Sequence, residues 1–294
     1  MTKKKLIFWA CDYSDKTGEG NLARKFIHQN YKEKKIQIKT INSKHIFKHK
    51  YIIPLIGIIN CWKYFLKNHN VGYLNYLPLW NFLIFFLLPP KTLLGPITGG
   101  ALYSKKNKIN YFIRNFFFPV FYKLSEFIIN LRFSRKLIFS TSLLKKFLSK
   151  KTIKKSEFNF VLKNIKFMKK KKIKDIDLLV YHKIHYNKSS FFDYDLISNL
   201  TKQNLKIIIV GDKLKMKGVK NLGYLNQKKL SILQSRSKYS LCSGENIYSL
   251  FVLECITNHV KILINKDYMR KVNFFKKFFI TLDKSKLTSK KLNM

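Results

Sequence analysis

One acidic residue stands inside a run that is otherwise apolar and helical in spacing. Glu254 lies in Leu250–Ile256, where apolar residues recur with the period of a helix. Burying an unpaired carboxylate is costly, so a ligand hydroxyl or an internal salt bridge is expected to satisfy Glu254. The helix starts near Ser249, and the free N–H groups of a helix start favour an anion such as phosphate. This stretch could therefore bind a phosphorylated ligand.

The elements around this helix predict where such a ligand would bind. Tyr239–Cys242 is a short β-prone run, Ser243–Asn246 is a cluster of turn formers, and Val260–Ile264 is a β-branched run. The order is strand, loop, helix and strand, which is the repeating unit of an open α/β sheet. In such sheets, ligands bind outside the carboxyl ends of the strands.

Two lysines follow an earlier predicted strand. The strand is Ile176–Tyr181, and Lys183 and Lys188 come after it, five residues apart. In a chain this rich in lysine, the spacing alone means little. Its place after a strand, and about 70 residues before the Glu254 helix, gives it weight.

The segment around Glu254 resembles the donor-binding motif of the GT-B glycosyltransferases of family 4, a large retaining class. Their pattern is a Glu, seven residues, and a second Glu on the helix. Glu254 matches the second Glu, whereas the first acid is Glu245, one residue earlier than the pattern, and Asn246 occupies the expected position. Ser249 and His259 stand where the family has glycines. The resemblance implies that Glu245 or Asn246, the catalytic candidates, lies near the transferred sugar.

That family also places an Arg and a Lys, five residues apart, after the first strand of its C-terminal domain to hold the donor diphosphate. Lys183 and Lys188 have this spacing, with Lys in place of Arg. A lysine cannot form the bidentate fork of an arginine, so weaker orientation of the phosphates is implied.

The resemblance implies a role for each donor-side residue. Glu254 would accept hydrogen bonds from the ribose of a nucleotide-sugar donor. Lys183 and Lys188 would neutralise the leaving diphosphate. The backbone N–H groups near Ser249 and Leu250 would assist them, so neither a metal nor another cofactor is expected.

The N-terminal part begins like a nucleotide-type βαβ unit. Leu6–Ala10 is predicted to be a buried strand, and a helix is predicted at Leu22–Tyr31, after a loop that contains Gly18 and Gly20. A tight turn that needs positive φ explains these glycines as well as ligand contact does. In GT-B enzymes this first loop touches donor or acceptor, so both glycines are donor-binding candidates.

A second glycine-rich loop, Gly95–Gly100, is the strongest turn signal in the chain and follows a predicted strand, Lys91–Leu94. The loop resembles, more loosely, the acceptor-side loop of GT-B enzymes. Thr98 and Gly99 are therefore the acceptor-side candidates.

Three segments are rich in apolar or aromatic residues. Tyr51–Phe65, which Pro54 interrupts, and Leu77–Leu88 are both shorter than the roughly 20 residues that a membrane span needs. Tyr111–Arg132 is predicted to be an aromatic helix bent near Pro119. Its basic residues suit an anionic bilayer surface, whereas core packing is the commoner explanation for such a stripe.

Basic residues dominate the charge. The chain has 59 Lys+Arg against 15 Asp+Glu, which gives a net charge of +44. Codon use in an A+T-rich genome explains such a lysine excess, and a nucleic-acid or anionic-membrane partner is the alternative. A dedicated nucleic-acid binder would more often carry arginine and a recognisable module, so nucleic acid is not the expected partner.

The cysteines show no pattern of chemistry. Cys11, Cys61, Cys242 and Cys255 form neither a CxxC pair nor a metal-ligand spacing. Free, buried thiols in a reducing compartment are expected. The apolar run Leu6–Cys11 is too short for an export signal.

Strands and helices alternate along the whole chain, which predicts an α/β fold. The resemblance specifies GT-B, with two Rossmann-like domains whose parallel sheets face each other across a cleft. Residues 1–165 would form the acceptor-side domain, 166–174 a Lys-rich linker, and 175–294 the nucleotide-sugar donor domain.

The expected function is that of a glycosyltransferase of the hexosyltransferase type (EC 2.4), retaining and metal-independent. It would move a sugar from a nucleotide-sugar donor to a glycan or lipid-linked acceptor. Surface polysaccharide or lipopolysaccharide synthesis, in the cytoplasm or on the inner face of the cell membrane, is the setting that the resemblance implies. One alternative is a non-catalytic GT-B-like or Lys-rich protein that binds nucleic acid or anionic membrane; another is a nucleotide-sugar epimerase.

Overall fold

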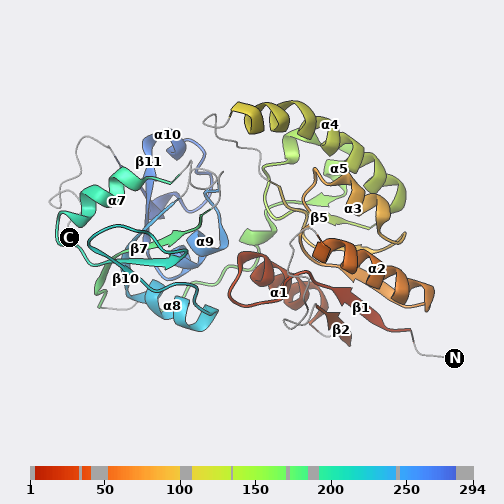
Figure 1. Ribbon diagram of the computed structural model, residues 1–294, viewed down its shortest axis with the longest axis horizontal. Helices are drawn as coiled ribbons and strands as arrows, with labels where there is room; N and C mark the ends of the chain where they lie inside the picture. The colour runs from red at the N-terminus through yellow and green to blue at the C-terminus, as the bar shows by residue number, and fades with distance from the viewer. Residues whose placement is uncertain are drawn as a thin grey trace. The chain divides into compact units, whose positions relative to one another are not determined.

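The computed structural model describes residues 4–32, 35–40, 52–99, 108–133, 135–169, 173–184, 192–242 and 246–282. The chain divides into two compact units, Met1–Ala101 with Asn107–Val161, and Leu102–Lys106 with Leu162–Met294. Each unit contains a parallel sheet with helices packed against it (Figure 1).

The first unit is built on a four-stranded parallel sheet in the order β2-β1-β3-β4. Its strands are β1 (Leu6–Trp9), β2 (Ile36–Lys39), β3 (Asn70–Tyr73) and β4 (Leu93–Leu94). The connecting helices are α1 (Gly18–Tyr31), α2 (Ile52–Leu66) and α3 (Phe82–Leu87). The strand β1 pairs on both sides, which is why all four of its residues are apolar.

The apolar segment around Pro54 is one continuous helix, α2. Pro54 is the third helical residue, in the first turn, where the backbone N–H that proline lacks would have no intrahelical partner. The expected interruption at Pro54 is therefore wrong.

The sequence also predicts a turn at Gly95–Gly100, but the described part of this segment is extended. Ile97 and Thr98 each form a parallel β-bridge to another segment. Gly95 is required by a close approach, since a Cβ there would lie 2.0 Å from the carbonyl oxygen of Leu74. At Gly95, the glycine thus reports crowding rather than a turn.

A small second sheet pairs two short strands in parallel, β5 (Leu137–Ile138) and β6 (Ser156–Glu157). Short helices lie beside them in the chain: η1 (Lys145–Phe147), α5 (Lys150–Lys154) and η2 (Phe160–Leu162). Phe160 of η2 packs against Phe26 of α1, with ring centroids 5.9 Å apart.

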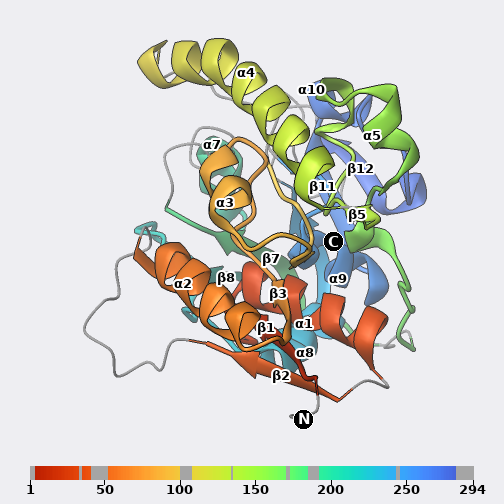
Figure 2. The same cartoon turned by 90° about the vertical axis from the view of Figure 1, so that its right-hand side faces the viewer.

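The predicted aromatic helix is present as α4 (Lys108–Arg132), and Pro119 lies inside it. Figure 2 shows α4 running past α3, with its first turns extending beyond it. Tyr122, Ser125 and Ile129 are buried on its inner face, so core packing explains part of its apolar character. In the described part of the chain, no helix is both long and apolar enough to cross a membrane.

The second unit is built on a six-stranded sheet in the order β12-β11-β10-β7-β8-β9, and every neighbouring pair is parallel. Its strands are β7 (Ile176–His182), β8 (Ile207–Gly211), β9 (Val219–Asn221), β10 (Ser237–Leu241), β11 (Lys261–Asn265) and β12 (Phe279–Leu282). Its helices are α7 (Tyr194–Thr201), α8 (Gln227–Arg236), α9 (Leu250–Thr257) and α10 (Lys266–Met269), with the short turn η3 (Lys276–Phe278) before β12.

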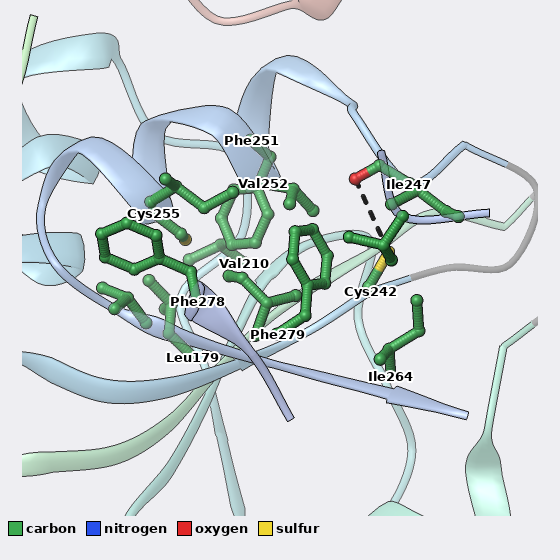
Figure 3. Packing of buried hydrophobic residues seen from close by; sticks show 14 of the residues in the cluster. Leu179, Val210, Cys242, Ile247, Phe251, Val252, Cys255, Ile264, Phe278 and Phe279 are labelled. Atoms are coloured by element: carbon green, nitrogen blue, oxygen red, sulfur yellow. Dashed lines mark hydrogen bonds between the residues drawn. The ribbon is translucent and has the colours of Figure 1, made fainter. Parts of the chain in front are cut away.

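Two apolar clusters fill the second unit. One gathers residues of β7, β8 and β11 with α9. Figure 3 shows Leu179 and Val210 near Phe251 and Cys255, and Ile264 near Cys242. The other joins β7 and β8 to α7. Because side chains alternate along a strand, the two clusters lie on opposite faces of the sheet.

All four cysteines are free, as predicted, and three of them are buried. Burial raises the pKa of Cys61 and of Cys255 to about 12, and the pKa of Cys11 to about 11. A thiolate is the reactive form of cysteine, so the raised pKa values lower the reactivity of these thiols at neutral pH.

The segment predicted to be a Lys-rich linker, 166–174, makes contacts in the second unit. The ammonium of Lys174 donates hydrogen bonds to the carbonyls of Ser237, Asn258 and His259, at 2.9, 3.3 and 2.8 Å. Phe167 stacks on Phe278 with centroids 5.7 Å apart. The described residues on either side of 170–172 are thus attached to the second unit.

Candidate functional site

The candidate site lies at the carboxyl edge of the six-stranded sheet. The strand β7 is flanked by β10 and β8, and all three run in the same direction, so their carboxyl ends meet at one edge. At this edge β10 leads to α9, β7 leads to Lys183, and β8 leads to Asp212.

The predicted helix start at Ser249 is confirmed. Ser249 has an extended backbone, and its hydroxyl accepts a hydrogen bond from the N–H of Val252 at 3.3 Å. Its carbonyl accepts the N–H of Leu253 at 3.0 Å, so Leu250 is the first helical residue. The first turn of α9 contains no acidic residue, which leaves its positive end available to an anion.

Glu254 is half-buried on α9, and a neutral amide contacts it. The Nε2 of Gln234, on α8, donates to Glu254 Oε2 at 3.3 Å, and Gln234 is fully buried. This amide is a neutral donor to the carboxylate, a kind of partner that the sequence does not predict.

Helix α9 starts against the end of β7. The ring of Tyr181, the next-to-last residue of β7, packs on the ring of Phe251 in the first turn of α9, with centroids 5.5 Å apart. Lys183 is exposed and lies two residues beyond Tyr181. The structure therefore brings the Lys183 segment and the start of α9 together at one edge.

Asp212 holds the backbone just after Lys183. Its Oδ2 accepts the N–H of Ile184 at 2.6 Å, and its Oδ1 accepts the hydroxyl of Tyr224 at 2.7 Å. Burial acts to raise the pKa of Asp212, but these two hydrogen bonds and the charge of Lys183 outweigh it and lower that pKa. Asp212 is therefore a carboxylate at neutral pH and fixes the start of the loop.

His182 is a buried polar residue at the same edge. Its Nδ1 is 3.0 Å from the carbonyl oxygen of Asp212, and its Nε2 is 3.3 Å from the hydroxyl of Tyr194. The sequence predicts no role for His182, Asp212 or Tyr224. Their only signal is that His182 and Asp212 follow the apolar runs of adjacent strands.

Two of the remaining site candidates, Lys188 and Glu245, lie outside the described residues. Asn246 is described and half-buried, three residues before the cap of α9. The catalytic pair of candidates is thus represented by Asn246 alone in the described chain.

The loop after β1 in the first unit is a hydrogen-bonded helix cap. Thr17 caps α1, and its hydroxyl accepts the N–H of Gly20 at 3.0 Å and donates to Asp12 Oδ2 at 2.5 Å. The buried Asn75, just after β3, accepts the N–H of Cys11 at 2.9 Å and donates to the carbonyl of Asp12. The loop therefore has an ordered backbone at the carboxyl edge of this sheet.

The two glycines of this region differ. A Cβ on Gly20 would lie 2.1 Å from the carbonyl oxygen of Ser14, whereas a Cβ on Gly18 would meet nothing within 4 Å. Neither needs positive φ, so the expected tight-turn explanation is wrong for both. Gly20 is required by close backbone packing.

On the acceptor side, Thr98 exchanges backbone hydrogen bonds with the segment after β3. Its N–H donates to Leu77 at 2.9 Å and its carbonyl accepts the N–H of Leu79 at 3.0 Å. Gly99 has φ of +154° and abuts the side chain of Leu144. No cluster of His, Cys, Asp and Glu that could hold a metal ion occurs among the residues the structure describes.

No protein-family model matches the chain, and a search of curated proteins found no match. Solved structures do match. The Anabaena protein HepE, in complex with UDP and glucose, is 12% identical over 99% of this chain and 89% of its own, with a TM-score of 0.54. The Methanocaldococcus jannaschii UDP-GlcNAc 2-epimerase, in complex with UDP-GlcNAc and UDP, is 13% identical over 96% of this chain and 89% of its own, with a TM-score of 0.45.

Escherichia coli heptosyltransferase WaaC, with ADP-2-deoxy-2-fluoro heptose, is 8% identical over 94% of this chain and 92% of its own, with a TM-score of 0.35. The fold assignment rests on HepE, whose likeness extends over nearly the whole chain. The chain has the GT-B fold. The predicted fold class, α/β with parallel sheets in both halves, is confirmed.

In this GT-B chain, the two departures from the glycine pattern leave α9 intact. Ser249 serves as the cap of the helix. His259 follows the helix with φ of +58°, a left-handed conformation that favours glycine, and its Nε2 is 2.8 Å from the carbonyl oxygen of Met168. The substitution of His for Gly therefore adds local strain at the far end of α9, away from the candidate site.

Proposed function

We propose that the chain is a glycosyltransferase that moves a sugar from a nucleotide-sugar donor to a glycan or lipid-linked acceptor. One observation carries this proposal: at the carboxyl edge of the second sheet, the start of α9, whose first turn contains no acidic residue, and the exposed Lys183 follow adjacent parallel strands. An edge with a helix start and a lysine suits a diphosphate. The GT-B fold makes a nucleotide sugar the natural source of that diphosphate.

Each donor-side residue then has a physical task. Lys183, with Lys188, neutralises the diphosphate as it leaves, and the N–H groups near Ser249 and Leu250 bind its oxygens. Glu254 accepts a hydrogen bond from a ribose hydroxyl. Charge neutralisation by these groups would make a metal ion unnecessary.

The finer assignments are part of the same proposal. Glu245 or Asn246 lies beside the transferred sugar, and transfer retains the anomeric configuration, as in a hexosyltransferase of class EC 2.4. In the first unit, Gly18 and Gly20 contribute to the donor side. Residues 1–165 act as the acceptor domain, 166–174 as the connection and 175–294 as the donor domain.

On the acceptor side, Thr98 and Gly99 would face the glycan or lipid-linked sugar. Assembly of a surface polysaccharide or lipopolysaccharide, in the cytoplasm or on the inner face of the membrane, is the cellular setting that we propose. Nucleic acid is not part of this proposal.

A thermal-unfolding screen without metal, against UDP, GDP, ADP, CMP and their sugar conjugates, tests the donor site. At about a hundred times its dissociation constant, a ligand that binds only the folded chain adds about 2.7 kcal/mol of stability. We expect one base to shift the transition. We expect Lys183→Ala and Glu254→Gln each to weaken binding of that nucleotide about tenfold, through loss of one charged or charge-assisted contact.

Lys202→Ala is the matched control. Lys202 is exposed just after α7, which runs back toward the amino ends of the strands, so the same change of charge occurs away from the candidate site. Equal weakening by Lys202→Ala and Lys183→Ala would mean that only the overall field attracts the nucleotide. No shift with any nucleotide would contradict the proposal and favour a non-catalytic protein. Donor turnover without any acceptor would instead indicate an epimerase.

A further inference from the structure

Helix α4 has an apolar face on each of two opposite sides. Its inner side is buried against the first unit through Phe118, Tyr122, Ser125 and Ile129, which recur every three or four residues. This is the spacing of one helix face. The inner face alone would satisfy a helix that belongs to an ordinary core.

The outer side of α4 carries a second stripe with the same spacing. Its exposed residues are Ile109, Phe112, Phe116, Val120, Phe127 and Leu131. Their exposed fractions are large: Ile109 is 74% exposed, Phe116 is 62% exposed and Leu131 is 70% exposed. An apolar stripe of this length on a surface marks an interaction site.

Helix α3 adds exposed apolar side chains beside α4. Phe82 of α3 packs on Phe121 of α4, with ring centroids 5.5 Å apart, and Leu83 and Phe86 of α3 are more than half exposed. The guanidinium of Arg132 lies over the ring of Phe86, 5.9 Å from its centroid. We call these exposed residues of α3 and α4 the α3–α4 face.

The charges of α4 are arranged for an anionic partner. The side chain of Lys123 is 61% exposed while its ammonium lies 3.3 Å from Glu126 Oε2, and Lys108 is exposed at the start of the helix. Glu126, the one acid in the sequence of α4, is turned inward, where its carboxylate accepts the N–H and hydroxyl of Ser149. The outer side of α4 therefore combines aromatic side chains with positive charge and displays no carboxylate.

We propose that the α3–α4 face docks on an anionic lipid bilayer, with α4 lying in the plane of the interface. Phe, Leu and Ile side chains would enter the boundary between headgroups and acyl chains, and Lys and Arg would contact lipid phosphates. A second copy of the chain fits this face less well, because each copy carries a net charge of +44 and the copies repel each other.

Co-sedimentation with vesicles tests the proposal, and it does not depend on glycosyl transfer. Vesicles of phosphatidylcholine with phosphatidylglycerol should bind the chain, with binding that weakens as salt is added, and vesicles of phosphatidylcholine alone should bind it less. The double variant Phe116→Asp with Phe127→Asp should lower the partition coefficient on the anionic vesicles by about 100-fold or more, since it removes two large apolar groups from the interface.

The matched control is Ile173→Asp with Ile232→Asp, in the second unit. Both isoleucines are exposed, so this double variant makes the same change of charge and the same kind of apolar loss elsewhere. It should bind vesicles within a few-fold of the unaltered chain. Equal losses in both double variants, or unaltered binding by the α4 variant, would overturn the proposal. So would an α4 variant that turns a dimer into a monomer without affecting vesicle binding, because that result assigns the face to a second copy. Unaltered urea midpoints verify that both variants fold.

Discussion

Replacing Gly20 by Ala should cost the first unit about 2–4 kcal/mol of unfolding free energy. The added Cβ would lie 2.1 Å from the carbonyl oxygen and 2.7 Å from the nitrogen of Ser14, and 2.8 Å from the hydroxyl of Thr17. Two of these atoms are backbone, so no side-chain rotation removes the clash. Relief requires the loop to move, which breaks the Thr17 cap and its bond to Asp12. Urea unfolding, followed by fluorescence, measures the loss.

Gly18→Ala is the control for this variant. Gly18 is the first residue of α1, its φ is ordinary, and an added Cβ meets nothing within 4 Å. Alanine there restricts the unfolded chain and should leave stability unchanged or raise it by up to about 1 kcal/mol. Similar losses at both positions would show that the crowding around Gly20 does not determine the difference.

The strands of both sheets were accessible to sequence analysis because strands buried on both faces are continuous apolar runs. Leu6–Ala10, Ile176–Tyr181 and Val260–Ile264 all predict strands that the structure contains. The edge strand β12 was missed. Its four residues follow Lys276 and Lys277 in a basic tail, and only its register with β11, Ile262 opposite Phe279, identifies it.

Two residues of types that usually interrupt secondary structure led to wrong predictions because of where they lie in the fold. Pro54 is tolerated because it falls in the first turn of a helix, and the start of α2 at Ile52 could not be located from an apolar run without a cap residue. Gly95 marks a backbone approaching it from β3, not a turn. A glycine in a sequence shows that a constraint exists but does not say which one.

In the candidate site, too, some features could be predicted from the sequence and others could not. Ser249 and the start of α9 were predictable because a cap and its helix are local in sequence. The contacts among His182, Asp212 and Tyr224 were not, because they depend on β8 lying next to β7 and on the loop after β9. His182 and Asp212 are 30 positions apart in the chain, Asp212 and Tyr224 are 12 positions apart, and no periodicity in the sequence connects them.

Replacing Glu126 by Ala should lower the free energy of unfolding by about 2–4 kcal/mol at neutral pH. Glu126 is 5% exposed, and its Oε1 accepts both the N–H of Ser149 at 2.7 Å and the Ser149 hydroxyl at 2.5 Å. Ser149 is in turn the cap of α5, and its hydroxyl accepts the N–H of Thr152. Alanine leaves the N–H of Ser149, in a partly buried place, without this acceptor. Urea midpoints of the variant and the unaltered chain measure the effect.

The pH dependence of the free energy of unfolding tests whether the charge of Glu126 causes this stabilisation. Burial alone would raise the pKa of Glu126, but the hydrogen bonds from Ser149 and the charge of Lys123 outweigh it and hold that pKa below its ordinary value of 4.5. A carboxyl with a depressed pKa stabilises the fold above its ordinary pKa, and this contribution is lost as pH falls through the lower value in the folded chain. Glu126→Gln, which keeps an acceptor for Ser149, should therefore cost about 1–2 kcal/mol at pH 7 and a smaller amount at pH 3. Lys123→Gln should change stability by less than about 0.5 kcal/mol, because that ammonium is exposed. A Glu126→Gln deficit that is the same at both pH values would show that shape, and not charge, stabilises this contact between α4 and α5.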